Sequence, residues 1–289
     1  MDRFDWLELD SAPGVAPSAR ASVAPAAAAR AMPTDGPSFY RAAREMRYAG
    51  HFKAATDFYR KAIGLDERNY GAWVELIDTL VRAGRLEEAD TLSREASENY
   101  KLVRVFYAAR ALVLAHTGNM AEAMSLSDIS IDADAHTWYS RCVRGELFLK
   151  ADLSFRFEAL RLYEEAQGLV KAPWEPAFLA GWALLDARQF ALAASHLAEA
   201  AHLNARAPLI WLCLGDCFKA LKFYEQALFY YQRVSELEPA SDLAVKRQKE
   251  CGSLVYGLMR LFRSQDLTSR WRREFEKALQ QLEPQDNDY

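Results

Sequence analysis

The residues of this sequence best suited to metal or redox chemistry are Cys213 and Cys217, which stand four positions apart. On a helix they would share one face, where two thiolates could bind a soft metal or form a redox couple. A metal site would need two more ligands, and the sequence offers no local ones. Cysteine is also a common small buried residue, so we expect this pair to pack. With Cys142 and Cys251 far away and no CxxC pair, neither a disulfide framework nor a zinc finger is indicated.

The histidines do not form a constellation either. The chain carries no P-loop, no GxGxxG after a strand, no GxSxG and no HExxH. We therefore predict that the protein is not an enzyme and holds no metal or cofactor. The histidines are His51, His116, His136, His196 and His202.

A run of basic and aromatic residues near the C-terminus resembles a nucleic-acid or lipid patch in composition. Acidic residues interrupt it, and an amphipathic helix with a solvated outer face predicts the same pattern. The net charge of -4 and pI of about 5.8 give no basic field that would concentrate nucleic acid. We expect no nucleic-acid partner. The run comprises Arg260, Arg263, Arg270, Arg272, Arg273 and Lys277.

The sequence also indicates the cellular compartment in which the protein is expected. The first ten residues, MDRFDWLELD, lack the positive segment and apolar run of a secretory signal. No stretch approaches 18 consecutive apolar residues, which argues against a membrane span. We expect a soluble, cytoplasmic protein.

The elements that must position these residues repeat every 34 positions. Successive landmark alanines are 34, 34, 36, 34 and 34 residues apart, and the two extra residues fall in the turn KADLSFRF. We expect that turn to be longer than the others. Glycines at the first three turns repeat at the same interval and suit a left-handed helix end. The alanines are Ala55, Ala89, Ala123, Ala159, Ala193 and Ala227, and the glycines are Gly50, Gly84 and Gly118.

The last copy shows the full pattern. Trp211, Leu214, Gly215 and Phe218 are followed by Ala227, Tyr231 and Pro239, the order W-x2-L-G-x2-Y, then A-x3-F, then P. This spacing resembles the tetratricopeptide repeat family, whose unit is a pair of antiparallel helices. The resemblance implies an all-α fold, an α-solenoid wound as a right-handed superhelix of about six helix pairs, and a protein-binding function.

The repeats organise the chain into three parts. Residues 1–35 form an acidic and aromatic head followed by a tether rich in alanine and proline, which we expect to be disordered. Residues 242–289 show helical periodicity and are expected to be C-terminal capping helices with a frayed tail. The six repeats between them span 36–69, 70–103, 104–137, 138–173, 174–207 and 208–241.

The resemblance also implies that the first helix of each pair faces the concave groove. The position of each residue around its helix, relative to the residues that pack against neighbouring helices, then identifies a candidate binding surface. This surface is basic at its N-terminal end and mixed aromatic and acidic elsewhere. Phe178 and Trp182 are candidate anchors for a partner, or else pack against neighbouring first helices. The predicted groove residues are Tyr40, Arg44, Arg47, Tyr48, Asp78, Arg82, Glu146, Phe178, Trp182, Asp186, Asp216 and Lys219.

These observations predict a non-catalytic adaptor or scaffold that binds a peptide or helical segment of a partner protein in the groove. Some family members hold a peptide carboxylate in this groove, but here Asp78 would repel one. The alternative is a subunit of a larger assembly, or a secretion-type chaperone, in which the N-terminal segment docks in cis or in trans. Self-association through that segment, and binding on the convex face, remain open on the sequence alone.

Overall fold

The structure, a computed structural model, describes residues 33–131 and 137–261, with side chains as far as Ser253. Residues 1–32 of the N-terminal head and tether, and the basic residues of the C-terminal run from Arg263 onward, lie outside these residues. The described chain is built of α-helices with one short 3-10 helix and contains no strand.

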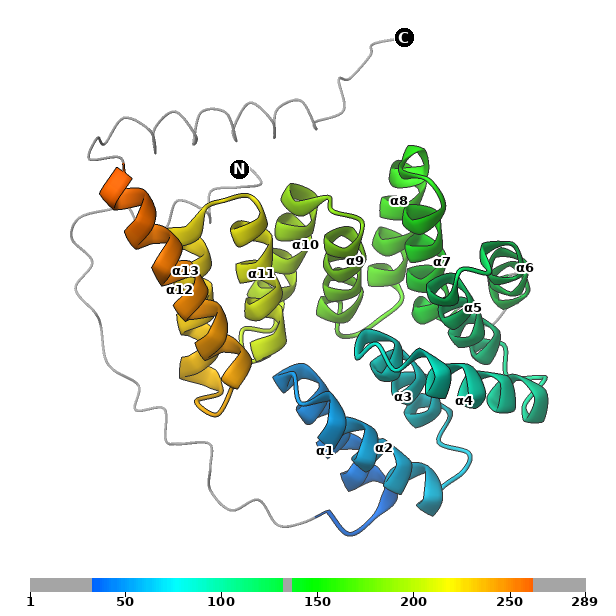
Figure 1. The fold of residues 1–289 in the computed structure, drawn as a ribbon. Coiled ribbons are helices and arrows are strands. Elements are labelled where there is room, and N and C mark those ends of the chain that lie inside the picture. The colour runs from blue at the N-terminus through cyan, green and yellow to red at the C-terminus, as the bar shows by residue number, and fades with distance from the viewer. Residues whose placement is uncertain (1–32, 132–136, 262–289) are drawn as a thin grey trace. The chain divides into compact units, whose positions relative to one another are not determined.

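The helices follow one another in pairs (Figure 1). In chain order the first three pairs are α1 (Gly36–Ala49) with α2 (Phe52–Leu65), α3 (Tyr70–Arg82) with α4 (Leu86–Asn99), and α5 (Val105–Thr117) with α6 (Met120–Ile131). The next three are α7 (Trp138–Ala151) with α8 (Arg156–Gly168), α9 (Trp174–Asp186) with α10 (Phe190–Leu203), and α11 (Pro208–Ala220) with α12 (Tyr224–Leu237). The longer helix α13 (Asp242–Leu261) follows and packs against α12.

Each pair packs internally and against the next pair along the chain. This arrangement confirms the all-α solenoid expected from the repeats. The landmark alanines explain the close approach, because all six are fully buried where the two helices of a pair meet. Gly145 serves the same purpose on α7, since a Cβ there would lie 2.9 Å from the ring of Tyr163. At Gly215 the space is filled by the ring of Tyr231.

The turns within the pairs fall into two kinds. Gly50, Gly84 and Gly118 adopt positive φ, and Arg188 and Lys222 adopt the same left-handed conformation in the fifth and sixth pairs. The fourth turn is different: it is longer and forms the short helix η2 (Leu153–Phe155), as the two extra residues predicted.

Contacts also join the first helix pair to the fifth and sixth. Helix α1 packs against α11, and it reaches α9 through an ion pair and aromatic contacts. The inner faces of α1, α3, α7 and α9 therefore meet, and this meeting positions the polar groups described next.

Candidate functional site

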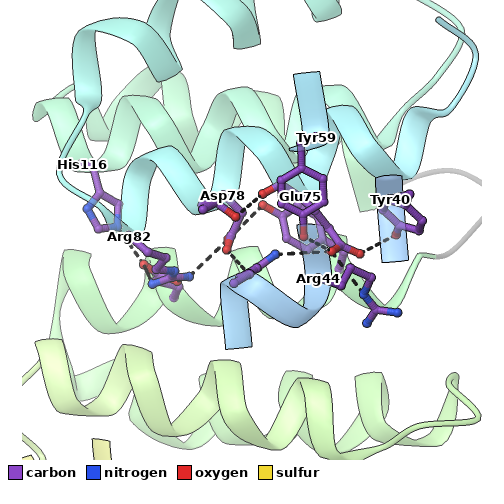
Figure 2. A network of polar contacts seen from close by, with 11 residues as sticks. Tyr40, Arg44, Tyr59, Glu75, Asp78, Arg82 and His116 are labelled. Atoms are coloured by element: carbon purple, nitrogen blue, oxygen red, sulfur yellow. Dashed lines mark hydrogen bonds and ion pairs between the residues drawn. The ribbon is translucent and has the colours of Figure 1, made fainter. Parts of the chain in front are cut away.

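The inner-face contacts centre on Asp78 of α3, whose side chain is fully buried. Its carboxylate accepts hydrogen bonds from Arg47 of α1 and, at 3.2 Å, from the hydroxyl of Tyr139 of α7. Arg82, one turn further along α3, lies 3.5 Å from Oδ1 of Asp78, the oxygen that also accepts from Tyr139 (Figure 2). Two cations and a phenol thus compensate one buried carboxylate, so Asp78 is not available to repel or attract a ligand.

Glu75 extends the network by one turn of α3. It accepts hydrogen bonds from the hydroxyls of Tyr40 at 2.6 Å and Tyr59 at 2.7 Å (Figure 2). Arg44 of α1 lies 3.3 Å from Glu75 and also pairs with Glu175 at the start of α9. Burial raises the pKa of Glu175, although Arg44 opposes the shift.

Glu146 of α7 closes the other end of the network. Arg82 contacts both of its carboxylate oxygens, at 3.0 and 2.5 Å, and Nε2 of His116 lies 2.8 Å from one of them. Burial alone would raise the pKa of Glu146, but the charge of Arg82 and the hydrogen bond from His116 outweigh it and lower the pKa to about 2. The carboxylate is therefore ionised and fully engaged at neutral pH.

Aromatic packing seals this part of the inner face. Tyr48 of α1 packs edge-on against Trp174 and Phe178 of α9, with ring centroids 4.6 and 5.8 Å apart. Phe52 contacts Trp182 at 6.3 Å. Phe178 is buried by these contacts, whereas Trp182 is half-buried with the guanidinium of Arg82 over its ring. Of the two expected anchors, only Trp182 remains accessible.

A second group of predicted residues lies on α11 and contacts α13 instead. Asp216 accepts a hydrogen bond from Tyr231 at 2.7 Å and pairs with Arg247 at 3.0 Å. Lys219 pairs with Glu250 at 2.5 Å. These four charged side chains keep between a quarter and about a third of their surface exposed. Asp186, at the end of α9, is exposed as well.

The predicted groove residues are therefore divided. Nine of them are linked to one another through direct contacts, namely Tyr40, Arg44, Arg47, Tyr48, Asp78, Arg82, Glu146, Phe178 and Trp182. Asp216 and Lys219 belong to the contacts with α13, and Asp186 lies close enough to Arg82 and Glu146 for their charges to affect its pKa, which burial raises. We call the buried ion pairs of Arg47, Asp78, Arg82 and Glu146 the sealed region, and those of Asp216, Lys219, Arg247 and Glu250 the open region.

Sequence reasoning missed Glu75, Tyr139 and Glu175. Helical spacing was the signal that could have found them. Glu75 stands three and seven residues before Asp78 and Arg82, and Glu175 stands three and seven before Phe178 and Trp182. Residues so spaced share a helix face, so the inner face should have been extended toward the start of each first helix.

The chemistry of the described residues is that of ion pairs and packing. The four cysteines are buried and unpaired, and burial raises the pKa of each thiol, Cys213 and Cys217 included. No group of three or more His, Cys, Asp or Glu in the described ranges is arranged to hold a metal ion. Among the same residues, no helix is long and apolar enough to span a membrane.

Paired helices, small residues at each crossing and an inner face of ion pairs define a helical repeat protein of the kind that serves as a scaffold for protein–protein interaction. Residues 37–146 match the family described as tetratrico peptide repeat. The resemblance noted from the sequence is confirmed.

Comparison with solved structures finds similar chains at low sequence identity. A chain of the APC/C hetero-tetramer Cut9-Hcn1 matches 75% of this chain at 13% identity and a TM-score of 0.45, and the match spans 43% of that chain. YrrB, described as a TPR protein with an unusual peptide-binding site, matches 66% of this chain and 97% of its own at 19% identity and a TM-score of 0.39. PilF of Pseudomonas aeruginosa matches 71% of this chain and 96% of its own at 18% identity and a TM-score of 0.42. The search of curated proteins finds no match.

Proposed function

We propose that the protein is a non-catalytic adaptor that binds a segment of a partner protein along the C-terminal part of its inner face, at Trp182, Asp186 and the open region. The observation that carries this proposal is the contrast in accessibility among the predicted groove residues. The charged side chains of the sealed region pair with one another and are buried. Those of the open region form ion pairs that are partly exposed.

Partly exposed pairs can be exchanged at little cost. A solvent-exposed ion pair contributes about 0–1 kcal/mol, so a partner's charges can replace Arg247 on Asp216 or Glu250 on Lys219 with small loss. Trp182 supplies the accessible aromatic surface that binding sites commonly use as an anchor. The segment that fits carries an apolar side chain flanked by charges of both signs.

The test is site-specific photo-cross-linking from the full chain in its native cells. A benzophenone side chain is placed at position 182, and a control chain carries it at position 229, where Phe229 is exposed on α12. The segment cross-linked from position 182 is identified by mass spectrometry and synthesised. Its affinity is then measured for the unmodified protein and for the charge-reversed variants Asp216→Lys and Lys219→Glu.

Each reversal is expected to weaken binding by about tenfold, because a buried or half-buried interfacial charge contributes more than an exposed one. The matched control is Arg233→Glu, which breaks an exposed pair with Glu236 on α12 and should leave affinity unchanged. Identical cross-links from positions 182 and 229, or equal loss in the control, would refute the proposal.

A further inference from the structure

The turn between α7 and α8 exposes apolar side chains to solvent. Leu153, Phe155 and Phe157 are 43, 44 and 59% exposed. Phe148, at the end of α7, stacks against Phe155 with ring centroids 5.6 Å apart. We call these four residues the fourth-turn patch. It lies in the pair that carries the two-residue insertion.

The other five repeats provide an internal comparison. At the position of Phe157 they have a charged residue or alanine, namely Lys53, Glu87, Ala121, Ala191 and Glu225. At the position of Phe155 four of the five are polar, namely His51, Arg85, Asn119 and Gln189, and the fifth is Phe223. Leu153 belongs to the longer turn and has no counterpart. The other five helix pairs pack without an apolar side chain larger than alanine at the position of Phe157, and four of them without one at the position of Phe155, so the packing of a pair does not require these two rings. In the sixth pair Phe223 contacts Phe218 as Phe155 contacts Phe148.

The turn and Phe148 are held in place by neighbouring groups. Asp152 accepts a hydrogen bond from the backbone N–H of Ser154 at 2.8 Å and fixes the start of the short helix η2. The guanidinium of Arg144 lies 4.8 Å from the ring of Phe148 and is itself paired with Asp128 at 2.7 Å. A surface fixed before binding loses little conformational freedom when a ligand arrives.

The size of the patch limits what can cover it. Its exposed apolar side chains present on the order of 300 Å², the size of the largest apolar patch on an ordinary monomer, which is often functional. A stable dimer buries roughly 800 Å² on each partner. The patch is too small for a second copy of the chain and matches a short peptide segment with one or two apolar anchors.

The charges beside the patch indicate the chemistry of that segment. The guanidinium of Arg156 lies 4.9 Å from the ring of Phe157, and among the described residues it forms no ion pair. Arg144, by contrast, is already neutralised by Asp128. A carboxylate that binds next to Phe157 would therefore meet an arginine available to pair with it. Glu158, exposed and adjacent in sequence, would oppose the same carboxylate.

From this geometry we infer that the fourth-turn patch is a second docking surface, separate from the inner face, that binds a short segment of a partner protein carrying aromatic or aliphatic side chains next to a carboxylate. The protein thereby joins two partners, one on the inner face and one at this turn.

The probe that tests this inference is a phage-displayed library of random 12-residue peptides, selected on the full chain. Counter-selection uses the variant Phe155→Gln/Phe157→Lys, which installs the residues of the fifth and first repeats and preserves the helix pair. Selected peptides are synthesised and titrated by fluorescence anisotropy. We expect a consensus with apolar and acidic residues and a loss of affinity of about tenfold or more in the variant.

Three single variants sharpen the result. Arg156→Gln should weaken the same peptides, and Glu158→Lys should strengthen them, because only the charge facing the ligand changes. Phe229→Ser removes an exposed aromatic residue on α12 and should leave affinity within about twofold. Circular dichroism melts check that every variant is folded, and the single charge variants decide the question if the double variant unfolds.

The inference would be overturned if the library gave no peptide consensus or a basic one. It would also be overturned if Arg156→Gln and Phe155→Gln/Phe157→Lys bound the peptides as tightly as the unmodified protein. So would patch-dependent binding to vesicles of anionic phospholipid in the absence of peptide binding, since that result would assign the exposed rings and Arg156 to a lipid surface.

Discussion

Asp78 and Asp216 occupy the same repeat position on α3 and α11, four repeats apart, yet their surroundings differ. Each accepts a hydrogen bond from a tyrosine and pairs with arginine. The side chain of Asp78 is fully buried, whereas that of Asp216 is 27% exposed. The same residue type at the same phase is a structural element in one repeat and part of an accessible surface in another.

The difference arises from contacts between distant repeats. Helix α1 covers the inner face near α3 and α9 and excludes water from the sealed region. Helix α13 pairs with α11 but leaves the charges of the open region partly solvated. An uncompensated buried charge costs several kcal/mol, while a solvated one costs little. Substitutions should therefore have large effects in the sealed region and small effects in the open region.

The largest effect is expected for Arg47→Ala. Arg47 is buried, donates to Asp78 and lies 5.3 Å from the ring of Tyr48. Its removal deprives a fully buried carboxylate of its closest cation and should lower the free energy of unfolding by about 3–5 kcal/mol. Urea denaturation followed by circular dichroism measures this loss, and a change below about 1 kcal/mol would mean that the network is not sealed from water.

The next largest loss of folding stability is expected at low pH, where Glu146 becomes protonated. The pKa of Glu146 in the folded state is about 2, below its ordinary value of 4.5. A lowered folded-state pKa contributes stability that is present above pH 4.5 and is lost as pH falls toward 2, in total about 3 kcal/mol. The contribution of Glu175 to stability depends on pH in the opposite direction. Because its pKa in the folded state is raised, Glu175 favours the folded state at low pH, and that contribution is lost as pH rises.

Glu146→Gln separates the two contributions. Urea unfolding of the protein and of this variant between pH 6 and pH 3 should show a shallower decline of stability in the variant, since its side chain does not titrate. Parallel pH profiles would contradict the assignment of Glu146 as the titrating group of the sealed region.

An intermediate effect is expected for Arg44→Ala, at the edge of the sealed region. Arg44 bridges Glu75 and Glu175, and its side chain is 32% exposed. Partial access to water screens the charges that it leaves behind, so the loss should be about 1–2 kcal/mol, between those of the two regions. A loss as large as that of Arg47→Ala in the same urea titration would place the boundary of the sealed region beyond Arg44.

The smallest effect is expected for Lys219→Ala in the open region. Its pair with Glu250 is partly exposed, and such pairs contribute about 0–1 kcal/mol. The melting temperature should change by only a few degrees. If partner binding weakens while stability is preserved, the open region is an interaction surface; a large loss of stability would instead make it a second structural network.

Local features of the fold were accessible from sequence because local packing dictates them. A pair of helices needs a small residue where they cross, so Ala55 and its counterparts recur in phase and mark every pair. The insertion near Leu153 predicted a longer turn for the same reason. Helical periodicity also predicted which residues of each first helix lie on the inner face, and so placed Arg47, Asp78, Arg82 and Glu146 on one surface.

The contacts between distant repeats were not accessible in this way. Whether α1 reaches α9 depends on small rotations accumulated over four repeat junctions, and no local pattern fixes their sum. The pairing of Arg44 with Glu175, 131 positions apart, and the burial of Phe178 against Tyr48 follow from that sum. For this reason the sequence predicted a continuous groove, whereas its N-terminal part is closed by side chains of the chain itself.

A paired measurement on Asp78→Ala and Asp216→Ala tests the division of the inner face most directly. Both changes remove one carboxylate from the same repeat position, and urea denaturation of the full chain gives the loss of unfolding free energy for each. We predict a loss of about 3–5 kcal/mol for Asp78→Ala and about 1 kcal/mol or less for Asp216→Ala. Equal losses in the two variants would contradict the division into sealed and open regions.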